Sequence, residues 1–288
     1  MYPILFQFGP ITIYSFGAFM ALAALSAAWV VSLELKRRGY NPELASTMVF
    51  AAAIGGLIGA RLLFILEEWQ NFLAAPLNYI LTGAGFTWYG GLFGGVIAVS
   101  WVLKKNKIPW LVGADIGGLG LTIAYGVGRI GCHVAGDGDW GTVTDVPWGV
   151  AYTNAIIGWV DPSTGVPYPP GTRVHPTPIY EFLESLFIFA ILWSLRKKNY
   201  APGTLAWLYL ILAGMARFAV EFWRVNPIVA FGLSEAQLIS LLLLALGLAL
   251  LFVQPGASKA RLEKQSDEAP AKSFRSFENS QNMEVPDL

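Results

Sequence analysis

Arginine side chains stand where this sequence is otherwise apolar, and they carry its clearest chemical signal. Arg61, Arg129 and Arg217 each fall within or at the end of a long apolar run. A charge near the centre of a bilayer costs at least about 2.5–3.5 kcal/mol, so it needs a partner or a wet cavity. Because guanidinium groups match phosphate geometry, the three together predict a site for a lipid phosphate. The alternative is that they reach the lipid headgroups or form structural ion pairs.

Further charged and polar side chains accompany these arginines. Arg217, Glu221 and Arg224 follow the spacing i, i+4, i+7 and therefore share one helix face. Four side chains are candidate proton acceptors for such a site, namely His133, Asp137, Asp139 and Tyr89. His133 has the ordinary pKa best suited to neutral pH, although it could equally be a hydrogen-bonding partner within a loop. Tyrosine, with an ordinary pKa of about 10, is a weaker candidate and could instead orient a substrate.

The apolar runs that carry these residues are long enough to cross a bilayer, which takes about 20 residues in a helix. They do not alternate in polarity as the strands of a membrane barrel would. Backbone polar groups in lipid must be satisfied internally, so the runs predict helices. The fold class is therefore all-α, a polytopic integral membrane protein with about seven transmembrane helices, at roughly 14–35, 45–66, 88–103, 113–130, 178–195, 203–222 and 234–253.

Composition supports this class and excludes others. Apolar residues make up 55% of the 288 and charged residues 13%, well below the usual share in soluble domains. Lys+Arg and Asp+Glu both number 19, and this zero net charge argues against nucleic-acid binding. Cys132 is the only cysteine, so neither an internal disulfide nor a CxxC metal site is expected. We predict no metal site and no cofactor.

The distribution of basic residues predicts the orientation. Lys and Arg cluster in every second connection, as in the segments around 36–38, 104–107 and 196–198. Because cytoplasmic loops collect such residues, the N-terminus is predicted outside and the C-terminus in the cytoplasm. The expected domains are a transmembrane catalytic domain over 1–255, with an external loop at about 131–177, and a disordered cytoplasmic tail over 256–288. Arg61, Arg129 and Arg217 then lie at one depth, below the outer headgroups.

Five local motifs, in this order, resemble those of the bacterial prolipoprotein diacylglyceryl transferases. They are GARLLF around Arg61, GFTWYGGLFGG (85–95), GRIG (128–131) with the acidic turn before Trp140-Gly141, HPTPIYE (175–181) and RFAVEFWR (217–224). The resemblance covers about residues 8–253 and includes the seven-span layout.

The resemblance implies an activity and roles for residues. Members of this family transfer the diacylglyceryl group of phosphatidylglycerol to the lipobox cysteine in the signal peptide of a prolipoprotein, at the bacterial inner membrane and from the outer leaflet. Arg129 and Arg217 would then bind the lipid phosphate, with Glu221 and Arg224 completing the site. Tyr180 and Glu181 would brace the arginines, and Arg61 is expected to contribute to substrate binding. Phosphatidylglycerol, a prolipoprotein and the lipid bilayer are the expected partners, and no nucleic acid is expected.

The sequence departs from the family pattern at several hydrogen-bonding positions. Tyr89 stands where the family usually has histidine, and Cys132 where it usually has asparagine. Phe16 and Ala213 replace tyrosines, and the acidic turn reads AGDGDWG instead of carrying one glutamate. Cys132 is expected to pack as a small apolar residue rather than act as a nucleophile. Two other hypotheses remain: a non-catalytic membrane paralogue that binds phospholipid or lipoprotein, and a transporter, although no repeat is evident.

Overall fold

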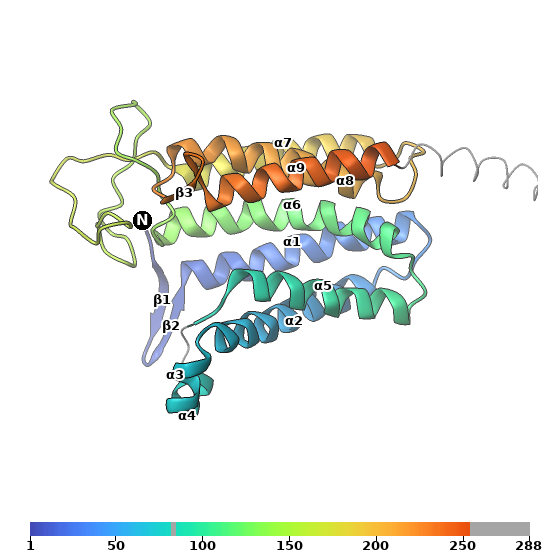
Figure 1. Cartoon of the computed structure of the whole chain (residues 1–288), viewed down its shortest axis with the longest axis horizontal. Coiled ribbons are helices and arrows are strands. Elements are labelled where there is room, and N and C mark those ends of the chain that lie inside the picture. Colours follow the sequence, from blue (N-terminus) through green and yellow to red (C-terminus); the bar gives the residue numbers. More distant parts are fainter. Residues whose placement is uncertain (82–84, 254–288) are drawn as a thin grey trace, which may run out of the picture.

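The structure is a computed structural model that describes residues 1–81 and 85–253. It is a bundle of long helices lying side by side, with a large irregular loop at one end (Figure 1). We call this end the loop end and the opposite one the far end. The helices are α1 Ser15–Arg37, α2 Leu44–Glu67, α3 Trp69–Ala74, α4 Pro76–Leu81, α5 Trp88–Lys105, α6 Trp110–Ala135, α7 Thr177–Leu195, α8 Thr204–Val220, the 3₁₀ turn η1 Glu221–Trp223, and α9 Glu235–Val253.

The long helices match the seven predicted spans, with one qualification. Six of them, α1, α2, α6, α7, α8 extended through η1, and α9, are long and apolar enough to cross a membrane. The remaining predicted span, α5, has 18 residues and is not among these six. It is rich in glycine and ends in Lys104 and Lys105, which makes it less apolar than the others. The predicted tail over 256–288 lies outside the described residues.

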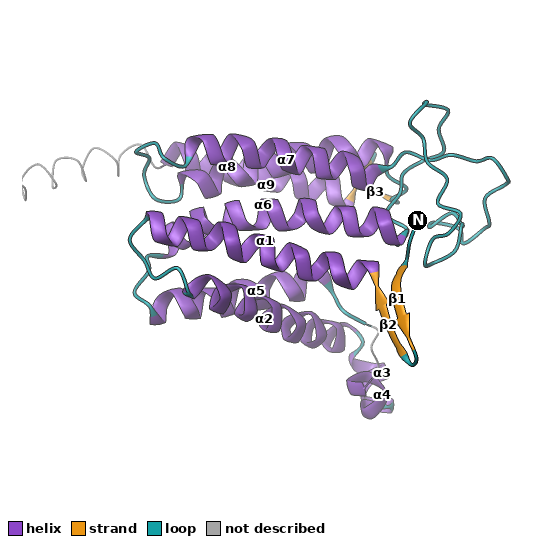
Figure 2. Cartoon of the chain, turned by 180° about the vertical axis from the view of Figure 1, so that it is seen from behind, coloured by secondary structure: helices purple, strands orange, loops and turns teal. Residues whose placement is uncertain are grey.

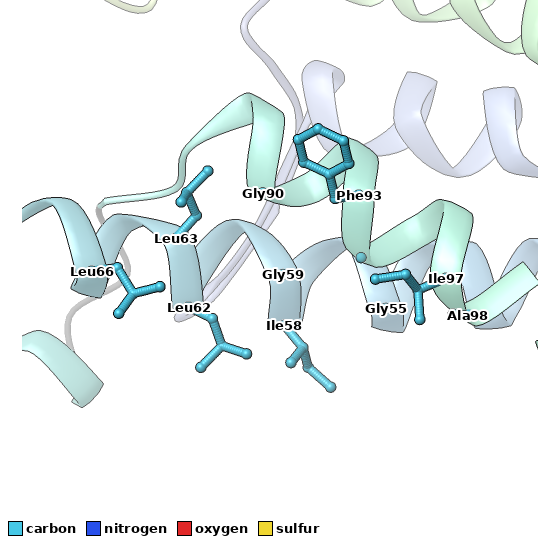
Figure 3. Close-up of a pocket in the computed structure, with 11 residues that line it drawn as sticks. Gly55, Ile58, Gly59, Leu62, Leu63, Leu66, Gly90, Phe93, Ile97 and Ala98 are labelled. Atoms are coloured by element: carbon cyan, nitrogen blue, oxygen red, sulfur yellow. The ribbon is translucent and has the colours of Figure 1, made fainter.

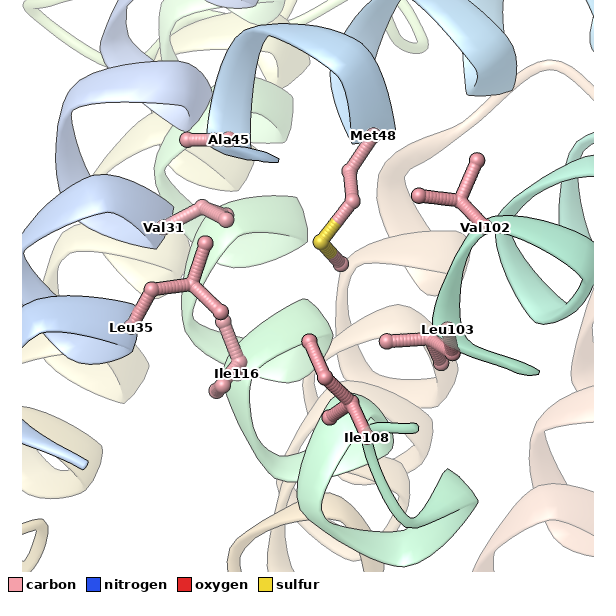
Figure 4. Close-up of a cluster of buried hydrophobic side chains, with 8 residues drawn as sticks. All are labelled: Val31, Leu35, Ala45, Met48, Val102, Leu103, Ile108 and Ile116. Carbon is pink, nitrogen blue, oxygen red and sulfur yellow. The ribbon is translucent and has the colours of Figure 1, made fainter. Parts of the chain in front are cut away.

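Helices α1 and α6 occupy the middle of the bundle and connect two groups of helices. On one side, Val30 of α1 and Leu119 of α6 pack with Ile188, Leu192 and Leu205 of α7 and α8. On the other side, a second buried cluster joins α1 and α6 to α2 and α5 near the far end (Figure 4), formed by Val31, Leu35, Ala45, Met48, Val102, Leu103, Ile108 and Ile116.

Helices α2 and α5 meet along a glycine seam (Figure 3). A Cβ added at Gly59 would lie 2.9 Å from Gly94 Cα, and one added at Gly55 would lie 2.6 Å from the Gly94 carbonyl oxygen. No larger side chain fits there without separating the helices. The small-xxx-small spacing of these glycines therefore serves close packing. An apolar groove of about 440 Å³ runs along the same pair of helices.

Two short hairpins lie at the loop end (Figure 2). Strands β1 Ile4–Phe8 and β2 Ile11–Tyr14 pair antiparallel, and so do β3 Ile228–Ala230 and β4 Leu233–Ser234. The first hairpin exposes large apolar side chains along both strands. The long loop is irregular but packed, because Trp140, Tyr152 and Val174 form a buried cluster within it.

A buried ion network closes the far end. Glu34 of α1 is fully buried and pairs with Arg37 at 2.6 Å and with Arg196, which follows α7, at 3.5 Å. Asp115 of α6 pairs with Arg38 at 3.4 Å. The Asp115 carboxylate also accepts hydrogen bonds from the backbone N–H groups at positions 203 and 206, both at 3.0 Å. It thereby satisfies amides at the start of α8 that have no partner within that helix.

Candidate functional site

Three of the four arginines predicted from sequence, all except Arg61, converge on one buried carboxylate at the loop end. Glu181 of α7 is 1% exposed. Its carboxylate lies 3.2 Å from Arg129 Nε, 3.2 Å from Arg224 Nη1 and 3.9 Å from Arg217 Nη1. It also accepts a hydrogen bond of 2.7 Å from the Tyr125 hydroxyl. Because a buried charge is tolerated only when paired and hydrogen-bonded, Glu181 fixes the relative positions of three guanidinium groups.

A second carboxylate, Asp139, connects two of these arginines from the loop side. It pairs with Arg129 and, at 2.7 Å, with Arg224. The Asp139 side chain is 33% exposed, so it is the most accessible anion of the network. Burial alone would raise the pKa of the Asp139 carboxyl, but the charges of Arg224 and Arg129 outweigh it and hold the pKa below its usual value.

Arg217 has its closest partner on its own helix face. Its Nη1 lies 2.6 Å from Glu221, the residue one turn further along, as the i, i+4 spacing predicted. Glu221 also accepts hydrogen bonds from Ser234 at 2.5 Å and from Asn226 at 2.7 Å. The Arg217 side chain keeps 27% of its surface exposed. Its guanidinium group is therefore oriented by Glu221 while still accessible.

The network is balanced in charge: Arg129, Arg217 and Arg224 face Glu181, Glu221 and Asp139. A bound phosphate would add negative charge to this balanced network. It can therefore bind without an excess of negative charge only if it replaces one carboxylate. Asp139 is the carboxylate placed for this exchange, because the side chains of Glu181 and Glu221 are almost completely buried. The arrangement is thus suited to binding an anionic group in place of Asp139.

Close backbone packing holds the loop over the network. The amide of Gly141 donates to the carbonyl oxygen of His175 at 2.8 Å, and the amide of Thr142 donates to that of Trp223 at 2.8 Å. A Cβ at Gly141 would overlap Trp223 and lie 2.8 Å from the Thr177 side chain. Only glycine fits at this junction, which brings the acidic turn against the start of α7 and the end of η1.

His133 faces the loop cluster rather than the arginines. Its Nδ1 lies 2.9 Å from the hydroxyl of Tyr152, and the two rings meet edge to face. Burial raises the pKa of Tyr152. These contacts favour the alternative that His133 is a hydrogen-bonding partner within the loop. Asp137 accepts a hydrogen bond of 3.3 Å from the amide of Asp139 and so shapes the acidic turn.

Tyr180 also points toward the loop. Its hydroxyl accepts a hydrogen bond of 2.7 Å from Trp148 Nε1 and lies 3.0 Å from His175 Nδ1. Burial lowers the pKa of His175. Tyr180 and Glu181 were both expected to brace the arginines. Glu181 contacts them directly, whereas these contacts of Tyr180 are with Trp148 and His175.

Arg61 is engaged where the chain enters α5. Its Nη1 donates to the carbonyl oxygen of Gly85 at 2.9 Å, and its guanidinium lies over the rings of Phe64 and Phe86. These contacts place the Arg61 guanidinium at the loop end of α2, at the edge of the bundle. They tie α2 to the segment that leads to Tyr89.

Tyr89 makes a contact that the sequence did not indicate. Its hydroxyl donates to Glu235 Oε1 at 2.5 Å, across 146 positions in the chain. The contact joins the first turn of α5 to the first turn of α9. Glu235, Ser234 and Tyr125 were not among the predicted site residues, because each acts through a contact between distant parts of the sequence that leaves no spacing pattern. Asn226 was also missed, because it contacts Glu221 from beyond the end of the helical spacing.

Cys132, Asp137 and Asp139 place one potential ligand atom each within 4.8 Å of one another. A cation there would meet the guanidinium of Arg129, which already pairs with Asp139. The positive charge of Arg129 beside these three side chains therefore argues against a metal ion among them. Cys132 is 8% exposed and lies 3.9 Å from Arg129 Nη1, consistent with the expected packing role.

The fold and this network define a polytopic membrane protein with a cluster of arginine–carboxylate pairs at the loop end. Comparison with known proteins names the family. The profile of the prolipoprotein diacylglyceryl transferases matches residues 3–253. Proteins named phosphatidylglycerol–prolipoprotein diacylglyceryl transferase are similar to this chain over most of its length. The one from Clostridium tetani is 35% identical over 250 residues, covering 86% of this chain and 96% of its own length. That from Pseudoalteromonas atlantica is 31% identical over 261 residues, covering 86% and 88%. The chain belongs to the prolipoprotein diacylglyceryl transferase family.

Proposed function

We propose that this protein is a phosphatidylglycerol–prolipoprotein diacylglyceryl transferase. It joins the diacylglyceryl group of phosphatidylglycerol to the thiol of a prolipoprotein's lipobox cysteine, forming a thioether and releasing glycerol phosphate. Family membership over residues 3–253 supports the reaction. The observation that carries the site is the convergence of Arg129, Arg217 and Arg224 on Glu181 at the loop end.

The lipid phosphate binds in this network in place of Asp139. Arg129 and Arg224 release the Asp139 carboxylate and turn to the phosphate oxygens, while Glu181 keeps both guanidinium groups in position. Arg217, fixed by Glu221, approaches from α8. As the carbon–oxygen bond to phosphate breaks, the leaving group gains negative charge, and cations already in place stabilise it without reorganising.

The attacking sulfur comes from the substrate. A free cysteine thiol has a pKa of about 8.5, so a nearby proton acceptor helps form the thiolate at neutral pH. His133, Asp137 and Tyr89 are the candidates on this chain, and Glu221 orients Arg217. Cys132 does not take part as a nucleophile.

The protein lies in the bacterial cytoplasmic membrane, with the loop end toward the outer leaflet. The basic connections at the far end support this orientation by the preference of Lys and Arg for the cytoplasm. In this orientation the arginine network meets phospholipid headgroups at their own depth, and the long loop faces the side where a signal peptide emerges.

The activity is tested in cells depleted of their native transferase. Expression of this chain is expected to restore a lipoprotein whose mass includes the diacylglyceryl group. A reporter prolipoprotein with its lipobox cysteine changed to serine is the control and should gain no mass. If the chain is present in the membrane but the cysteine is unmodified, the protein is instead the non-catalytic paralogue.

A further inference from the structure

The hydrogen bond between Tyr89 and Glu235 joins α5 and α9, two helices that pack mainly against other helices. Tyr89 lies in the first turn of α5, whose main packing partner is α2, whereas Glu235 begins α9 beside α8. The Tyr89 hydroxyl donates to the carboxylate at 2.5 Å, and the Glu235 side chain is exposed. The pair is therefore both strongly bonded and accessible.

The start of α9 is rigid, so Glu235 has a fixed position. The amide of Ser234 donates to Gln237 Oε1 at 3.1 Å, and the amide of Gln237 donates back to Ser234 Oγ at 3.2 Å. This reciprocal arrangement is a capping box, which fixes the first turn of a helix. The carboxylate of Glu235 in that turn is also favoured by the helix dipole.

The same turn connects Tyr89 to the arginine network. Ser234, the residue before Glu235, donates its hydroxyl to Glu221 at 2.5 Å, and Glu221 pairs with Arg217 at 2.6 Å. Tyr89 is thereby coupled to Arg217 through α9, although the two lie on helices of different groups. A lipid phosphate bound at Arg217 and a thiol bound at Tyr89 would therefore both lie at the loop end of the bundle.

We propose that Glu235 is a positioning residue for the transfer reaction, which orients Tyr89 as the group that accepts the proton of the lipobox thiol. The inference rests on the proposed function. Because the Tyr89 hydroxyl donates its hydrogen to Glu235, the lone pairs of its oxygen point away from the carboxylate and can accept a hydrogen bond from a thiol.

Each proton and electron pair in the proposed step has a defined destination. The thiol proton passes to the Tyr89 oxygen as the Tyr89 proton passes to Glu235. The sulfur forms its bond to the glycerol carbon, and the electron pair of the breaking carbon–oxygen bond goes to the phosphate. Glu235 then releases the proton to water, to which it is exposed. Among the described residues, the titratable and charged groups around Glu235 are Tyr89 from α5 and, beyond Ser234, Glu221 and Arg217.

The test measures kcat and KM for the purified full-length protein from pH 4 to 8, with phosphatidylglycerol vesicles and a lipobox peptide. Tyr89→Phe and Glu235→Gln are each expected to lower kcat by about 10²-fold, the lower range for general acid–base groups. The KM for phosphatidylglycerol should stay within about twofold. The double variant should be no slower than Tyr89→Phe, because residues that act as a unit are not additive.

The pH profile separates this role from a structural one. The wild-type rate should fall at acid pH, because the proposed transfer needs the Glu235 carboxylate as a proton acceptor. Glu235→Gln should lose this acid limb, and Glu235→Asp should restore part of the rate. Glu43→Gln removes an exposed carboxylate at the far end and is the matched control, with unchanged kinetics expected.

Two results would overturn the inference. One is a Glu235→Gln variant with wild-type kcat and an unchanged acid limb. The other is an effect confined to KM, which would make the pair a contact between helices. An inactive wild-type protein would instead contradict the proposed function, so the two failures are distinguishable.

Discussion

The two ends of the bundle each hold a buried network of arginines and carboxylates, yet only one of them leaves an anion exposed to water. At the far end, the side chains of Glu34 and Asp115 are 0% and 4% exposed, and Asp115 caps α8. At the loop end, Glu181 is equally buried, but Asp139 is partly exposed. The far network is closed and serves the fold, whereas the loop network contains an anion that a ligand can replace.

The largest expected effect is on catalysis at the loop end. Arg129→Lys and Arg217→Lys keep a positive charge beside Glu181 but lose the planar donor geometry that suits phosphate. Each should lower kcat by about 10²-fold or more, as loss of a transition-state donor does. Arg37→Lys at the far end is the matched variant and should stay within about twofold. Equal losses at both ends would remove the distinction between the networks.

The next effect is on stability at the far end. Asp115→Asn removes one of the two carboxylates that pair with Arg38, leaving Glu34 at 3.6 Å, and it weakens the cap on α8. Removing one member of a buried pair costs about 3 kcal/mol. We expect a lower midpoint of thermal unfolding in detergent, with kcat of the folded fraction unchanged. A clear drop in kcat without loss of stability would show that the far network also serves the reaction.

A smaller effect is expected when the exposed anion is neutralised. Asp139→Asn should lower the KM for phosphatidylglycerol a few-fold, because the phosphate no longer competes with a carboxylate for Arg129 and Arg224. Glu68→Gln, a partly exposed carboxylate at the loop end, is the control. A raised KM would instead mean that Asp139 holds the arginines in their binding geometry.

The same variant changes the pH dependence of stability. The pKa of Asp139 lies below its usual value of about 3.9. Its stabilising contribution is therefore complete above pH 4 and is lost as the pH falls through the lowered pKa. Thermal unfolding of the wild type between pH 5 and 2.5 should thus include an acid loss that is smaller in Asp139→Asn. Parallel curves would show that the arginines do not stabilise this carboxylate.

The smallest effect is expected at Cys132. Cys132→Ala removes one small, buried side chain next to Arg129, and kcat should stay within about threefold with modest loss of stability. Intact-protein mass should show no lipid attached to Cys132 in the wild type during turnover. A lipid-modified intermediate on this residue would contradict the assignment of the nucleophile to the substrate.

The sequence predicted the long helices and the convergence of arginines at one end, because both follow from apolar run length and helical spacing. The pairing of Arg217 with Glu221 could also be predicted, because the two residues are four apart in a helix. The β1–β2 hairpin and helices α3 and α4 were not predicted, since strands of four or five residues and helices of six carry too little periodicity. The bond between Tyr89 and Glu235 depends on how α5 and α9 pack, which no local pattern encodes.

The far network also has a consequence for how the chain is assembled during synthesis. Asp115 enters the membrane with α6, but the amides it caps lie 88 and 91 residues further along the chain. Glu34 likewise meets Arg37 at once and Arg196 only after α7 is made. Until α8 arrives, Arg38 is the partner available to Asp115. Insertion of α8 therefore completes the far end, and a chain stopped before it would lack the backbone partners of the Asp115 carboxylate.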